Sequence, residues 1–199
     1  MIFREDERSQ CIEELKQAVA RLKNGQVGNV VPEVQSNLGY ALPGASCAAD
    51  VAAVPGRMIR VGENVETLHD PAFGVSSHIA AVILTVMRFD MGFRSAMNTR
   101  FSDEIVGIMK ALNFTVTSFD RSSEPKETKR REGSSLEWGM TNALSRHKGI
   151  PDAIFDRGDV GKEPIIRILG HAPAEVADKV LQISKVLKKN QENMRHVTQ

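Results

Sequence analysis

The sequence predicts an α/β fold, because segments typical of helices and segments typical of strands alternate along the chain. The chain has 199 residues, 41% of them hydrophobic and 26% charged, which is an ordinary balance for one globular domain with a sizeable core. The longest apolar run, residues 79–87, is too short to cross a bilayer. We therefore expect a soluble α/β domain without internal repeats.

The N-terminal half begins with a predicted amphipathic helix over residues 9–24, where apolar residues recur at helical spacing. Residues 25–45 are rich in glycine and proline and are expected to be extended and turning, so no helix-turn-helix is predicted. Residues 57–61 indicate a short strand. Ser76 and Ser77 are residue types that cap helices, and a strongly apolar helix follows them.

The C-terminal half continues the alternation. A helix is expected to start at Ser102 and to stop at Asn113. Further elements follow in order: a strand over 114–119, a polar surface loop over 120–135, a helix over about 136–148, strands over 152–156 and 164–170, and a last helix from Pro173. The polar tail after Lys188 is expected to fray.

Charge and cysteine content argue against several classes of protein. The formal net charge of +1 gives no reason to expect a nucleic acid as partner. Cys11 and Cys47 have no CxxC or metal-ligand spacing, so neither a disulfide framework nor a structural zinc site is predicted. Residues 1–10 are charged from the fourth residue and do not resemble a signal peptide. We expect a cytoplasmic protein with no membrane partner.

Residues 155–164, "FDRGDVGKEP", place three carboxylates, an arginine and a lysine between two predicted core strands. Gly158 and Gly161 permit positive φ and close approach of a ligand, and Lys162 could neutralise a phosphate. The candidate Mg²⁺ ligands are Asp156, Asp159 and Glu163. The alternative is a charged hairpin whose acids and bases pair in water, and the sequence leaves both interpretations open. A P-loop is excluded, because its residue order is absent.

Other polar residues gather at the predicted element ends. His78 lies in the first turn of a helix, where free N–H groups favour anions, and Arg57 follows a Pro-Gly turn. Each also has an ordinary explanation, a half-exposed histidine or a solvated arginine. Trp138 could stack on a heteroaromatic ring, although a place in the core is favoured slightly. The candidate substrate- and phosphate-binding residues are Asn37, Ser76, Ser77, Asn98, Arg100, Asp120, Arg121 and Lys162.

Several linked motifs carry a resemblance to a known family. They are, in order, "VPEVQSNLGYALPGA", "VPGRMIRV", "FGVSSHIA", "AMNTRFS", "SFDRSSEP", "EGSSLEWG" and "PDAIFDRGDVGKEPIIRILG". Over residues 28–187 this series resembles the ThiN-type thiamine-phosphate synthase domain. The resemblance implies a three-layer α/β/α fold with a mixed, largely antiparallel sheet, like that of class II (AraD-like) aldolases. It also implies an N-terminal helix and lead-in over 1–27, a catalytic domain over 28–188 and a tail over 189–199.

The resemblance further implies a reaction. A 4-amino-2-methyl-5-pyrimidinylmethyl diphosphate and a thiazole phosphate would give thiamine phosphate and pyrophosphate, with Mg²⁺ as cofactor. Arg57 and His78 match the arginine and histidine that are catalytic in the family. The partners expected are the phosphorylated substrates and a second copy of the chain, and the domain can occur fused to a hydroxymethylpyrimidine kinase. The alternative is a non-catalytic sensor that binds thiamine phosphate; the lack of a helix-turn-helix favours the enzyme.

Overall fold

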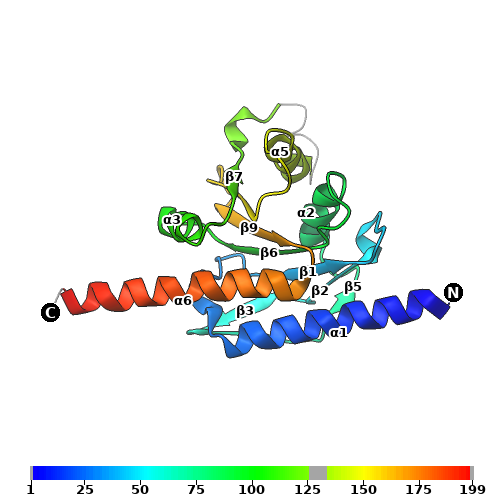
Figure 1. Cartoon of the computed structure of the whole chain (residues 1–199), viewed down its shortest axis with the longest axis horizontal. Coiled ribbons are helices and arrows are strands. Elements are labelled where there is room, and N and C mark those ends of the chain that lie inside the picture. The colour runs from blue at the N-terminus through cyan, green and yellow to red at the C-terminus, as the bar shows by residue number, and fades with distance from the viewer. Residues whose placement is uncertain (1, 126–133, 198–199) are drawn as a thin grey trace.

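The computed structural model describes residues 2–125 and 134–197, which form one large sheet with helices on both of its faces (Figure 1). The sheet has seven strands in the order β5-β2-β1-β6-β9-β8-β7, and only the β7–β8 pair is parallel. Its strands in chain order are β1 (Leu38–Ala41), β2 (Val51–Ala53), β5 (Ala72–Phe73), β6 (Ser95–Arg100), β7 (Val116–Ser118), β8 (Ala153–Asp156) and β9 (Ile165–Gly170). A separate hairpin pairs β3 (Met58–Val61) with β4 (Asn64–Thr67). The predicted α/β class with a mostly antiparallel sheet is confirmed.

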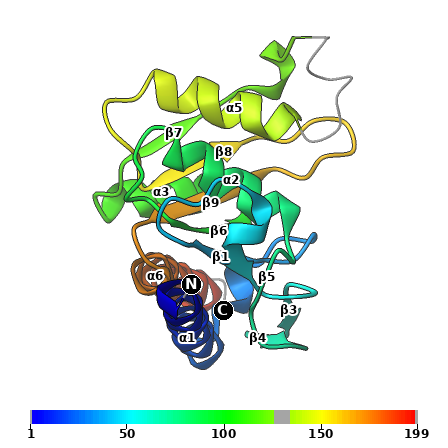
Figure 2. The ribbon, with the colours of Figure 1, turned by 90° about the vertical axis from the view of Figure 1, so that its right-hand side faces the viewer.

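Two groups of helices cover the sheet (Figure 2). One hydrophobic cluster joins the first face to α1 (Ile2–Asn24), α3 (Asp103–Ala111) and α6 (Pro173–Val197). A second cluster joins the other face to α2 (Ser77–Met87) and α5 (Ser134–Ser145). Because successive side chains of a strand point to opposite faces, each central strand contributes to both clusters. The polar pocket described below opens on the α2–α5 side.

Two helix starts agree with the capping residues in the sequence. The Ser76 side chain accepts a hydrogen bond from the backbone of Ile79 at the start of α2, at 3.5 Å. Ser102 accepts one from Ile105 at the start of α3, at 3.1 Å. These caps satisfy N–H groups that the first turn of a helix leaves without an internal partner. They also fix where each loop ends beside the sheet.

The structure differs from the sequence prediction at both ends of the chain and in several strands. Helix α1 begins at Ile2, seven residues before the predicted start. The last helix continues to Val197, nine residues beyond Lys188, where the sequence predicts a polar tail. Beyond Lys188, Asn190 hydrogen-bonds to Glu104 of α3, which ties part of the polar end of α6 to the fold. Strands β1, β2, β4, β5 and β6 were not predicted. None of the helices in the described residues is long and apolar enough to span a membrane.

Candidate functional site

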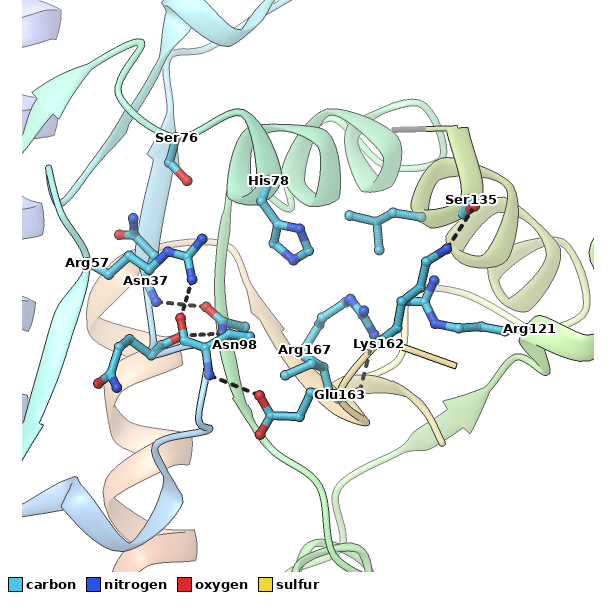
Figure 3. Close-up of a pocket in the computed structure, with 15 residues that line it drawn as sticks. Asn37, Arg57, Ser76, His78, Asn98, Arg121, Ser135, Lys162, Glu163 and Arg167 are labelled. Atoms are coloured by element: carbon cyan, nitrogen blue, oxygen red, sulfur yellow. Dashed lines mark hydrogen bonds between the residues drawn. The ribbon is translucent and has the colours of Figure 1, made fainter. Parts of the chain in front are cut away.

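A pocket of about 360 Å³ lies between the start of β1, the start of α2 and the β8–β9 hairpin (Figure 3). Its polar lining comes from segments that are far apart in the chain. The lining residues are Val34, Gln35, Asn37, Arg57, Ser76, His78, Asn98, Arg121, Ser135, Leu136, Gly161, Lys162, Glu163, Ile165 and Arg167. Both predicted catalytic residues, Arg57 and His78, are in this set.

Arg57 reaches the pocket from a turn with an unusual backbone. Its φ is 71° and that of Gly56 is 73°, so a non-glycine residue occupies the left-handed region. Such a conformation costs on the order of 1–3 kcal/mol and persists only where its surroundings hold it. A guanidinium nitrogen of Arg57 donates to the carbonyl oxygen of Val34, which lies across the pocket wall. The turn therefore holds an arginine where backbone preference alone would favour glycine.

Two asparagines hold this turn in place. The side-chain amide of Asn37 donates to the carbonyl oxygen of Val54 at 3.0 Å and accepts from its N–H at 2.9 Å. Asn98 on β6 accepts from the backbone N–H of Asn37 at 2.7 Å and donates to the carbonyl oxygen of Gln35 at 2.9 Å. Both line the pocket as predicted, but their amides are engaged with backbone. Their role in the structure is to fix the pocket wall beside Arg57.

His78 stands in the first turn of α2 with its ring open to the pocket. Desolvation by the surrounding protein is the largest influence on its pKa, and the positive charges of nearby arginines, Arg167 first, add to it. Together they lower the pKa of His78 to about 4. At neutral pH the ring is therefore uncharged, with one nitrogen able to donate a hydrogen bond and the other able to accept one.

The pKa of His78 is expected to rise when an anion enters the pocket, because a nearby negative charge favours the imidazolium. An NMR titration of the ring protons should give a midpoint near 4 in the free protein and a higher midpoint with pyrophosphate bound. The same shift has a consequence for stability. Because the unfolded-state pKa is about 6.5, the contribution of neutral His78 is complete above that pH and is lost as the pH falls toward 4. A midpoint that saturating pyrophosphate leaves unchanged would place the anion away from this ring.

The far wall of the pocket contains a buried cluster of two arginines around one aspartate. Arg121 donates to Asp156 at 2.6 and 3.2 Å, and Arg167 donates to it at 2.8 Å. The side chains of Arg167 and Asp156 are fully buried, and that of Arg121 is 8% exposed. Burial alone would raise the pKa of Asp156, but the hydrogen bonds and charges of the two arginines hold it below its ordinary value. Asp156 therefore stays ionised and orients both guanidinium groups.

Arg167 is the main lining residue that sequence reasoning missed. It lies in the middle of β9, "IIRILG", whose six residues are all buried. An arginine inside such a strand is itself a signal, because arginine is almost never fully buried unless it is paired. Gln35 and Ser135 also line the pocket, and nothing in their local sequence sets them apart.

The predicted metal ligands do not come together. Asp156 has its oxygens occupied by the two arginines and by the backbone N–H of Gly158. Glu163 accepts from the backbone N–H groups of Glu33 at 2.9 Å and Val34 at 3.0 Å. Within residues 2–125 and 134–197 there is no group of three histidine, cysteine or acidic side chains that could hold a metal ion. These residues do not fit a metal centre held by the protein.

The segment that connects β8 to β9 is a tight hairpin. The backbones of Asp159 and Lys162 form two hydrogen bonds within it, at 2.8 and 3.1 Å. Lys162 extends from it over the pocket and contacts the hydroxyl of Ser135 at 3.3 Å. The sequence left two interpretations of this segment open, a ligand-binding loop and a charged hairpin, and neither was complete. It is a hairpin, as the simpler one held, and it also lines the pocket with Gly161, Lys162 and Glu163.

Four other candidates lie outside the pocket lining. Ser77 lines a second pocket over α2, and Arg100 lines a third, where it donates to the carbonyl oxygen of Asn29 at 2.6 Å. Asp120 caps the short helix Arg121–Ser123 by accepting from the N–H of Ser122 at 2.8 Å. Trp138 is half-buried on α5. The structure gives Asp120 a capping role, and Ser77, Arg100 and Trp138 do not belong to the pocket lining.

Comparison with known proteins identifies a family. The family model for thiamine-phosphate synthase ThiN matches residues 14–182. Thiamine-phosphate synthase ThiN of Methanothermobacter thermautotrophicus is 35% identical over 89% of this chain and 94% of its own length. The bifunctional thiamine biosynthesis protein ThiDN of Methanocaldococcus jannaschii is 38% identical over 90% of this chain but only 42% of its own length. The domain therefore also occurs within a longer protein.

Solved structures show the same relationship. The C-terminal domain of a phosphomethylpyrimidine kinase superposes with a TM-score of 0.85 at 39% identity, covering 89% of this chain and all of that one. A sugar-phosphate aldolase from Thermotoga maritima has a TM-score of 0.51 at 12% identity, covering 90% and 95% of the two chains, which is a likeness of fold alone. Because the family model and the relative from Methanothermobacter thermautotrophicus both match most of its length, the chain belongs to the ThiN-type thiamine-phosphate synthase family.

Proposed function

We propose that this chain condenses 4-amino-2-methyl-5-pyrimidinylmethyl diphosphate with 4-methyl-5-(2-phosphoethyl)thiazole to thiamine phosphate and pyrophosphate. The observation that carries the proposal is the convergence of Arg57 and His78 with a buried arginine pair on one pocket. The name of the relative from Methanothermobacter thermautotrophicus supports the same activity. We also infer that the fold is of the class II aldolase type, with the solved aldolase as its support.

The proposed chemistry asks the protein mainly for charge stabilisation and alignment. The bond between the pyrimidine methylene carbon and the diphosphate oxygen breaks, and its electron pair leaves with pyrophosphate. The thiazole nitrogen then donates its lone pair to the resonance-stabilised carbon, forming the new C–N bond. Groups that meet the growing negative charge on the departing oxygen lower the barrier, provided that they are already in position.

Arg57 and His78 are suited to that role. A guanidinium binds a phosphate through two parallel hydrogen bonds, and the hydrogen bond to Val34 fixes the orientation of Arg57. A neutral His78 donates one N–H to the diphosphate, and its basicity increases as that negative charge grows. The start of α2 adds backbone N–H groups that favour an anion at the same place.

Magnesium enters this proposal only as an ion that the diphosphate brings with it. Mg²⁺ is usually bound through substrate phosphates and few protein carboxylates, and Asp156 and Glu163 are engaged elsewhere. No step depends on a metal ion held by this chain.

Incubation of the protein with the pyrimidine diphosphate, the thiazole phosphate and Mg²⁺ is expected to yield thiamine phosphate and an equal amount of pyrophosphate. Chromatographic detection of thiamine phosphate, with a parallel pyrophosphate assay, would measure both products. The matched control omits the thiazole phosphate. Tight binding of thiamine phosphate without any turnover would instead indicate the sensor role.

A further inference from the structure

Arg167 has hydrogen-bond donors that the protein does not use. Its Nη1 donates to Asp156 and to the carbonyl oxygen of Ile165, at 2.8 and 3.2 Å. Its Nε and Nη2 are buried and have no partner among the residues that the structure describes. Leaving a buried donor without a partner costs about 1–3 kcal/mol, and more for a charged group. This side chain lines the pocket, so a ligand bound there is the candidate partner for its unused edge.

The shape of that edge suits one kind of ligand. Nε–H and Nη2–H lie on the same side of a guanidinium and point in parallel. This fork matches two oxygens of one phosphate group, and bidentate pairs of this type are among the strongest hydrogen-bonded contacts. Arg121 uses the same edge, Nε and Nη2, to hold Asp156. The buried aspartate thus aligns one guanidinium and leaves the fork of the other unoccupied.

Charge around Arg167 points to a dianion. The two buried arginines and Asp156 leave one positive charge, and Lys162 at the rim adds a second. The nearby carboxylate of Glu163 accepts from the backbone N–H groups of Glu33 and Val34, in the turn before β1. Burial lowers the pKa of Arg167, although a guanidinium remains protonated in proteins. A phosphomonoester carries about −1.5 to −2 charge at neutral pH, which balances this group of side chains.

Arg121 and Lys162 lie across the pocket from the Arg57 side of the proposed diphosphate site, and Arg167 lies between them, near His78. Figure 3 shows Arg57 and Ser76 at one side of the pocket, with Arg121 and Lys162 at the other. The reaction needs such a separation, because one anion leaves from the pyrimidine methylene while the other stays on the thiazole side chain. A single cationic site would attract both phosphorylated substrates and let them compete.

We propose that Arg167, Arg121 and Lys162 form a second anion subsite, which binds the phosphomonoester of the thiazole substrate and of the product. Arg167 binds it through its free fork, and Lys162 approaches from the hairpin. The assignment of this phosphate rests on the proposed function. The subsite makes the protein prefer a phosphorylated acceptor to the corresponding alcohol.

The test compares binding of thiamine phosphate with binding of thiamine by calorimetry, which needs no turnover. In the unmodified protein the phosphorylated compound should bind at least tenfold more tightly. Lys162→Met should reduce that preference by about tenfold, or about 1.4 kcal/mol, through weaker binding of thiamine phosphate alone. Arg167→Lys, which keeps the charge and removes the fork, should reduce it further. Arg157→Met is the matched control, because Arg157 lies in the same hairpin and pairs with Asp103 outside the pocket.

Thermal melts establish that each variant is folded. Lys162 is exposed, so its variant remains informative even if Arg167→Lys does not fold. If Lys162→Met keeps the full preference for thiamine phosphate over thiamine, the proposed subsite is overturned. If Lys162→Met and Arg167→Lys bind pyrophosphate more weakly but keep the preference for thiamine phosphate, these residues bind the diphosphate. That result would also overturn the proposed subsite. An inactive protein that shows the expected preference would refute only the synthase proposal.

Discussion

Alanine in place of Arg57 or of His78 is expected to lower kcat by roughly a hundredfold or more, the effect of removing one preorganised donor from a developing anion. Both groups should contact the diphosphate more strongly in the transition state than in the ground state, because negative charge grows on the departing oxygen. The loss should therefore appear in kcat as well as in kcat/KM. Steady-state kinetics on purified variants would measure it.

A second substitution at Arg57 separates activity from folding. Arg57→Gly should be as inactive as Arg57→Ala but more stable by on the order of 1 kcal/mol, because glycine adopts a φ of 71° without strain. Gly56→Ala at the neighbouring position, where φ is 73°, should instead lose stability. If Arg57→Ala or His78→Ala turns over at the rate of the unmodified protein, the substituted residue does not belong to the catalytic site. A large fall in melting temperature would show that its role is structural.

The elements that could be predicted from the sequence are those with strong local signals. Ser76 and Ser102 cap helices because their side chains satisfy first-turn N–H groups, and the apolar spacing behind each defines a buried face. Strands β8 and β9 were recognised from continuous apolar runs on either side of the charged hairpin. Arg57 and His78 were found through motifs, and the fold places both on one pocket.

Strands β1, β2 and β6 could not be predicted because they lack such signals. β1 and β2 are short and rich in glycine and alanine, and both their faces are buried, so polar and apolar residues do not alternate. In β6, Asn98 appeared to belong to a polar segment ahead of a helix. Its amide is in fact used to hold the segment around Gln35, a contact that only the tertiary structure defines.

The three predicted metal ligands do not form a cluster in the structure, for a related reason. Asp156, Asp159 and Glu163 are close in sequence, and proximity in sequence suggested a shared ligand. Asp156 ends β8 and pairs with Arg121 and Arg167, whereas Glu163 accepts from the backbone of Glu33 and Val34 before β1. The partner that decides the role of Asp156 is Arg167, on the neighbouring strand. A local pattern cannot specify such a pairing across the sheet.

Asp156→Ala is expected to destabilise the protein by about 3–5 kcal/mol, the cost of breaking a buried ion pair by removing one partner. The substitution leaves Arg121 and Arg167 facing one another in the interior with no carboxylate between them. Urea unfolding followed by circular dichroism would measure the change. The control is Arg157→Ala, which removes an exposed ion pair with Asp103 and should cost less than about 1 kcal/mol.

Two further measurements test the physical cause of that loss. Because its folded-state pKa is lowered, Asp156 contributes stability above its unfolded-state pKa of about 3.9, and this contribution is lost as the pH falls through the folded value. The variant should therefore lack this part of the acid destabilisation. Thiamine phosphate should also restore part of its stability, because the bound phosphate supplies negative charge beside Arg167. A loss below 1 kcal/mol would mean that the two arginines do not depend on Asp156 for their burial.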